Sequence, residues 1–77
     1  MVRELDLVAL TGDLLERGLE RGDVGTVVHG YADGQSYEVE FVTAAGATLA
    51  VLTLTAAAIR PLAGRELLHV RPLAATA

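Results

Sequence analysis

The alternation of apolar and polar side chains predicts a chain built from short β-strands. Residues 36–41, Ser-Tyr-Glu-Val-Glu-Phe, give the clearest pattern, because every second side chain is apolar. Successive side chains of a strand point to opposite faces of the sheet. The segment therefore predicts a strand with one apolar face and one acidic face, the latter carrying Glu38 and Glu40.

Four further segments have strand patterns, and turn signals separate them. They are residues 5–11, 23–29, 47–54 and 59–60. Glycines, an Asp-Gly pair and a proline lie between or after them, and these residues are typical of turns and strand ends. Residues 13–23 contain leucines but are broken by glycines, so they predict a long irregular loop with leucines tucked under it. Five short strands in 77 residues predict an all-β domain, most economically a small five-stranded barrel.

The segment after Pro61 is predicted to be an extension of this barrel. We assign residues 1–61 to the barrel and residues 62–77 to a C-terminal extension of the same domain. Residues 66–72 alternate well enough to predict a sixth strand, a C-terminal extension strand, and residues 74–77 are expected to fray. The biological role would then depend on whether this strand docks on its own barrel or on another chain.

The composition and the N-terminal residues indicate where in the cell the protein is expected. The chain has no cysteine, so it forms no disulfide and no cysteine-based zinc site. Acidic residues near the N-terminus are not typical of a secretion signal, and the apolar stretch 44–59 is too short to span a bilayer as a helix. We therefore expect a cytoplasmic protein with no membrane association.

No group of residues in the sequence supports catalysis. Metal sites usually need three or four protein ligands, and His29 and His69 are the only imidazoles. Ser36 is the only serine and has no histidine beside it. Glu38 and Glu40 have roughly the 7 Å spacing of paired carboxylates, but the outer face of a small barrel offers no deep pocket. We expect a protein that is not an enzyme and has no cofactor or metal, in which Glu38 and Glu40 form an acidic recognition strip; no small-molecule substrate is identified.

The surplus of apolar residues points to a partner. Residues 49–54 are apolar on both faces, and the extension repeats this feature, although a small barrel has only one interior. Either the extension covers the surplus or another chain does, because an exposed apolar patch marks an interface. The residues expected to bind a partner are Leu52, Leu54, Leu67, Leu68, Val70 and Arg71.

These features favour a protein-interaction or assembly module that joins a protein partner or a second copy of itself. An accessory, immunity or antitoxin-like subunit fits a small chain of net charge −4, since a negative surface suits a basic partner. The alternative is a nucleic-acid-associated barrel that uses Arg60, Arg65 and Arg71. It is less favoured because nucleic-acid binding depends on cationic side chains and this chain is acidic.

Several short segments resemble one known family. They are Asp-Leu-Val-Ala-Leu-Thr at 6–11, Gly-Asp-Val-Gly-Thr-Val-Val at 22–28, Tyr-Glu-Val-Glu-Phe at 37–41, Val-Leu-Thr-Leu at 51–54 and Arg-Pro at 60–61. Over about residues 5–62 the chain is similar to a family of small bacterial proteins, domain of unknown function 4926. The resemblance implies an SH3-like barrel and a bacterial origin, and it implies no particular activity.

Overall fold

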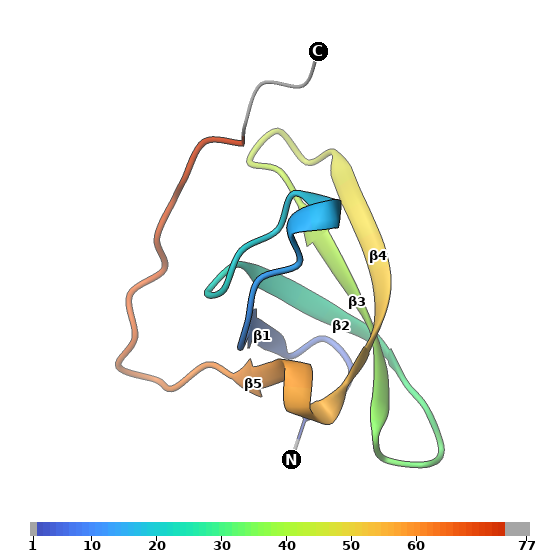
Figure 1. Cartoon of the computed structure of the whole chain (residues 1–77). Coiled ribbons are helices and arrows are strands. Elements are labelled where there is room, and N and C mark those ends of the chain that lie inside the picture. The colour runs from blue at the N-terminus through green and yellow to red at the C-terminus, as the bar shows by residue number, and fades with distance from the viewer. Residues whose placement is uncertain (1, 74–77) are drawn as a thin grey trace.

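The computed structural model describes residues 2–73, which form one antiparallel five-stranded sheet (Figure 1). The elements are β1 (Leu7–Leu10), η1 (Leu15–Arg17), β2 (Val24–Gly30), β3 (Ser36–Val42), β4 (Thr48–Thr55), η2 (Ala56–Ala58) and β5 (Ile59–Pro61), where η denotes a short 3-10 turn. The strand order is β4-β3-β2-β1-β5, so β4 and β5 are the two edges and the sheet is not closed. The predicted all-β class is confirmed.

All five strands lie close to the predicted segments, and the largest difference is at the first. Leu5 adopts a left-handed backbone with φ of 73°, which is incompatible with a regular strand. A local turn surrounds it, in which the Asp6 N–H donates to the Arg3 carbonyl at 3.1 Å. The Asp6 carboxylate in turn accepts the Arg3 N–H at 2.9 Å. The strand therefore begins only at Leu7.

The core lies on the concave side of the sheet. Tyr37, Val39 and Phe41 of β3 are buried there, as the alternation predicts. They pack with Leu19 and with apolar side chains from each of the other four strands. The members from those strands are Val8, Leu10, Val27, Leu52, Leu54 and Ile59. The core is thus aliphatic with two aromatic rings.

The loop between β1 and β2 is irregular, as predicted, and it closes one end of the core. Leu14 and Leu19 form an isolated antiparallel bridge. Leu19 is buried and Leu14 packs against the core, whereas Leu15 points into solvent with 73% of its surface exposed. Two of the three leucines are therefore tucked beneath the loop.

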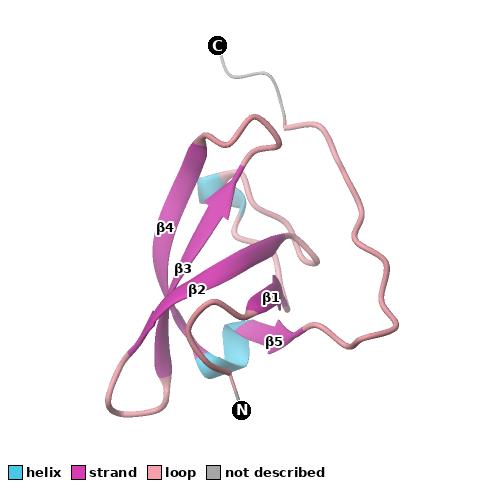
Figure 2. Ribbon diagram, turned by 180° about the vertical axis from the view of Figure 1, so that it is seen from behind, coloured by secondary structure: helices cyan, strands magenta, loops and turns pink. Residues whose placement is uncertain are grey.

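The prediction of a sixth strand at residues 66–72 is wrong. Within the described residues, the chain after Pro61 contains no strand and curves away from the sheet (Figure 2). A turn redirects it early, since the Glu66 N–H donates to the Ala63 carbonyl at 3.1 Å. The predicted frayed end, residues 74–77, lies outside the described residues. Among residues 2–73, no helix is long and apolar enough to cross a membrane.

Candidate protein-interaction surface

The chain after β5 forms an arch, defined here as residues 66–71, whose two ends are fixed by side chains. At the near end, the Arg60 guanidinium donates two hydrogen bonds to the Glu66 carboxylate, at 2.8 and 2.7 Å. The same carboxylate accepts the Ala63 N–H at 2.6 Å. A bidentate arginine–carboxylate pair fixes geometry as well as distance, so it sets the direction in which the arch leaves β5.

At the far end, Arg71 reaches back to the turn that leads into β2. Its guanidinium donates to the two carboxylate oxygens of Asp23, at 2.8 and 2.6 Å. It also donates to the Gly18 carbonyl at 3.0 Å and lies 3.6 Å from the Glu20 carboxylate. Arg71 was predicted to contact a partner. Its side chain is instead committed to this intramolecular anchor.

The two anchors lower the pKa values of the carboxyl groups that they contain. Hydrogen bonds from Arg60, and then from the Ala63 N–H, lower the pKa of Glu66 to about 2. The hydrogen bonds from Arg71 likewise lower the pKa of Asp23. Both shifts arise because N–H donors stabilise the charged form of a carboxyl group. Both anchors are therefore ion pairs at neutral pH.

Between the anchors, the apolar side chains of the arch point into solvent. Leu67 is 96% exposed, Leu68 64% and Val70 84%. These are three of the six residues predicted to bind a partner, and the structure leaves them accessible. Covering apolar surface is favourable by roughly 25 cal/mol for each Å² removed from water. The arch therefore offers an apolar surface that the sheet of the same chain does not cover.

A hollow of about 490 Å³ lies between the far end of the arch and the hairpin that joins β3 to β4. Figures 1 and 2 both show these two segments side by side. The lining of this hollow is mostly apolar, and its polar members include Asp23, His69 and Arg71. The apolar side chains of the lining include Leu19, Phe41, Val42, Leu49, Val70 and Leu73. The hollow could accept an apolar side chain of a partner.

The prediction that Leu52 and Leu54 bind a partner is wrong. Both side chains are buried in the core, with 7% and 8% of their surface exposed. Their places in the β3–β4 ladder explain this, because Leu52 lies opposite Val39 and Leu54 opposite Tyr37, which both face inward. The exposed apolar side chains of β4 are instead Leu49 and Val51, at 41% and 48%.

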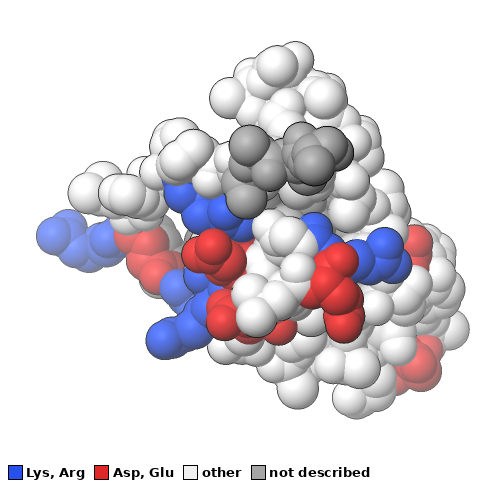
Figure 3. Space-filling model, turned by 45° about the horizontal axis from the view of Figure 1, so that its top comes forward, with Lys and Arg blue, Asp and Glu red and all other residues white. Residues whose placement is uncertain are grey.

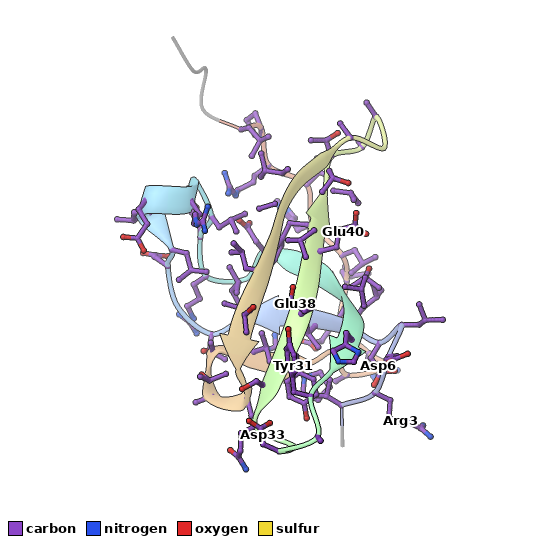
Figure 4. The ribbon with its side chains drawn as sticks, turned by 90° about the vertical axis from the view of Figure 1, so that its right-hand side faces the viewer. Arg3, Asp6, Tyr31, Asp33, Glu38 and Glu40 are labelled. Carbon is purple, nitrogen blue, oxygen red and sulfur yellow. The ribbon has the colours of Figure 1, made fainter. Side chains whose placement is uncertain are left out.

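Glu38 and Glu40 lie in line along β3, on the face opposite the core (Figure 4). Each is half-buried and accepts a hydrogen bond from a threonine of β4. Thr53 donates to Glu38, and Thr48 donates to Glu40 at 2.7 Å. The predicted acidic strip therefore exists as a row of two carboxylates, each already engaged by a neighbouring hydroxyl group.

The three C-terminal arginines of the alternative prediction do not form a shared cationic surface. Arg60 and Arg71 are each paired with a carboxylate. Only Arg65 of the three makes no ion pair within the described part of the chain. On the face drawn in Figure 3, arginine and acidic side chains lie interleaved. This arrangement reduces the positive field that a phosphate backbone would meet.

Comparison with known proteins adds a family and no activity. Neither a curated protein nor a solved structure matches the chain. The family described as Domain of unknown function (DUF4926) matches residues 4–61, which include all five strands and end where β5 ends. The arch lies outside the matched region, and the four residues 62–65 lie between them. On this match, the chain belongs to the DUF4926 family.

Proposed function

We propose that this protein is a non-catalytic protein-interaction module of the cytoplasm, in which a small SH3-like barrel presents the arch to a partner. The order of the strands supports the barrel assignment. Four consecutive antiparallel strands are followed by a 3-10 turn, and β5 returns to lie beside β1. A sheet that curls around one core with its last strand beside its first is the arrangement expected of such a barrel.

The observation that carries this proposal is the exposure of Leu67, Leu68 and Val70 on a segment that is held in place. A flexible tail must be ordered when it binds, which costs conformational entropy. Here the ion pairs at Glu66 and Arg71 already restrain both ends of the segment. A partner would therefore bind an apolar segment that is already largely ordered, so binding would lose little conformational entropy.

The partner that fits is a protein with an apolar groove bordered by basic side chains. The groove would cover the arch, and the hollow next to Val70 would receive an apolar side chain in return. The basic border follows from the net charge of −4, because opposite charges speed association and exclude wrong partners. Such a role matches an accessory, immunity or antitoxin-like subunit. The nucleic-acid alternative has weaker support, since two of its three arginines are paired.

The test compares three forms of the full chain as affinity baits in an extract of the native cell. The arch variant L67S/L68S/V70S replaces the exposed side chains, and Leu15→Ser, another exposed leucine outside the arch, is the matched control. We expect the wild type and the control to capture the same protein and the arch variant to bind it at least ~30-fold more weakly, as for an interface hot spot. Equal binding by the arch variant would refute the proposal.

A further inference from the structure

We infer that this protein also forms a two-fold symmetric dimer in which β4 pairs antiparallel with β4 of a second copy. This inference goes beyond the proposed function and does not rest on it. The arch and β4 have no residue in common, although Val42 and Leu49 beside the β4 edge also line the hollow next to the arch. Substitutions at Leu67, Leu68 and Val70 and substitutions at Val51 therefore act on separate surfaces.

The hydrogen-bonding pattern of β4 leaves backbone groups available for such pairing. Within the described residues, β4 pairs with β3 on one side only. The Ala56 N–H donates to the Gln35 carbonyl at 2.8 Å, which fixes the alternation of bonded pairs along this ladder. Leu52 and Leu54 consequently bond to β3. Val51 and Thr53 direct their N–H and C=O groups toward the open side.

The two edges of the sheet differ in how they are protected. Natural edges usually carry charged residues, prolines or very short strands, which prevent pairing with other chains. The β5 edge has all three features, because it is only three residues long and contains Arg60 and Pro61. The eight residues of β4, Thr-Leu-Ala-Val-Leu-Thr-Leu-Thr, include no charge and no proline. β4 is therefore the edge that remains open to pairing.

The absence of charge from β4 is what selects a second copy as the occupant. In a two-fold pairing, a side chain near the axis lies beside its own copy, so a charge at such a position would meet the same charge. The chain has a net charge of −4, so two copies repel one another on average. β4 itself carries no charge, and the charged side chains in the hollow beside it, Glu16 and Arg17, are opposite in sign, so two copies can approach here with little of that repulsion.

The side chains beside this edge would gain from the contact. Val51 is exposed on the outer face of β4, Leu49 is exposed at the irregularity near the start of β4, and Val42 at the end of β3 is 55% exposed. Two residues that lie opposite one another in the β4–β4 pair must face the same side of the sheet. If the two strands overlap almost completely, this condition places the two-fold axis at Val51 or Leu52. Stable interfaces bury about 1,200–2,000 Å² in total, and weak, transient ones bury less. A single pair of eight-residue strands is a small contact. We therefore expect reversible, micromolar association.

The experiment is sedimentation velocity on the full chain over a series of concentrations. We expect the wild type to shift from monomer to dimer as concentration rises, and Val51→Lys and Val51→Glu to remain monomeric. An equimolar mixture of these two variants should form a heterodimer, because the added charges then attract across the axis. Val28→Lys, an exposed position on β2 away from this edge, is the matched control and should dimerise like the wild type.

Three results would overturn the dimer: a wild type that stays monomeric throughout, a Val51→Lys variant that still dimerises, or a mixture that does not associate. Thr53→Lys repeats the test if circular dichroism shows that Val51→Lys is unfolded. The arch variant L67S/L68S/V70S should dimerise normally. A monomeric wild type that still captures its partner through the arch would refute this inference alone, and a dimer whose arch variant binds the partner normally would refute only the proposed function.

Discussion

Arg71 is joined to Asp23, 48 residues earlier in the chain, by two hydrogen bonds of 2.8 and 2.6 Å. Asp23 immediately precedes β2, and its carboxylate also accepts the Glu20 N–H at 2.8 Å. One carboxylate therefore organises the turn that enters β2 and holds the far end of the arch. The segment after β5 owes its position to side-chain anchors and not to a strand ladder.

Replacing Arg71 should release the far end of the arch while the sheet stays intact. We expect Arg71→Gln to lower the heteronuclear NOE of backbone amides at residues 67–72, because these amides lose their restraint on the picosecond–nanosecond timescale. Arg65→Gln is the control, since Arg65 forms no ion pair within the described residues. An unchanged NOE in Arg71→Gln would show that the Asp23 contact does not hold the arch.

The near anchor, the ion pair of Arg60 and Glu66, predicts that the position of the arch depends on pH. The pKa of Glu66 in the folded protein is lowered to about 2, below the value of the unfolded chain. A lowered pKa means that the anchor's contribution is complete above the unfolded pKa and is lost as pH falls through the folded pKa. The near end of the arch should therefore stay in place in mild acid and be released near pH 2. A carboxyl ¹³C NMR titration would measure this midpoint.

The variant Arg60→Gln tests whether Arg60 causes the low pKa of Glu66. Without its guanidinium, the Glu66 midpoint should rise toward the ordinary value for a glutamate, while Arg65→Gln should leave it unchanged. A low midpoint that persists in Arg60→Gln would assign the shift to the Ala63 N–H instead, which is the second contributor.

The sequence predicts the strands because their signals are local. Alternation across residues 36–41 is unambiguous, and β3 lies within one residue of that segment. Residues 49–54 are apolar on both faces, so alternation cannot say which face is inside. That choice depends on the register with β3, which places Leu52 opposite Val39. Partner binding was accordingly predicted at the buried pair Leu52 and Leu54, and the exposed Leu49 and Val51 were missed.

The arch could not be predicted for a different reason. Residues 66–72 have a strand-like pattern, but a strand exists only where an open sheet edge lies within reach. The contact of Arg71 with Asp23 joins distant parts of the chain, and nothing in the local sequence of either residue indicates it. The available signal was chemical: a lone arginine in an apolar segment of an acidic chain needs a carboxylate partner.

The corrected assignment of β4 can be tested with two adjacent residues. Leu52→Ala should destabilise the fold by about 2–4 kcal/mol, because it leaves a cavity in the core. Val51→Ala, at an exposed position next to it, should change the free energy of unfolding by less than about 0.5 kcal/mol. Urea denaturation at a concentration where the chain is monomeric would compare them. Equal effects would contradict the register of β4 on β3.

The close approach of β2 to β3 predicts that Gly25 cannot be replaced. A β-carbon at Gly25 would lie 2.6 Å from the Val39 Cγ1, 2.9 Å from the Phe41 Cε1 and 3.0 Å from the Glu40 carbonyl oxygen. Both side chains are buried and the carbonyl belongs to the backbone, so none of the three can move aside cheaply. Gly25→Ala should therefore cost roughly 1–3 kcal/mol through overpacking.

The matched variant is Gly12→Ala, where the added β-carbon would have no heavy atom within 4 Å. Neither glycine has a positive φ, so alanine meets no backbone strain at either position. Alanine also reduces the entropy of the unfolded chain, which makes Gly12→Ala neutral or stabilising by up to about 1 kcal/mol. The difference between the two variants isolates the steric effect, because the entropic gain is common to both. If urea denaturation gave both variants the same midpoint, β2 and β3 would have to be farther apart at Gly25 than the structure places them.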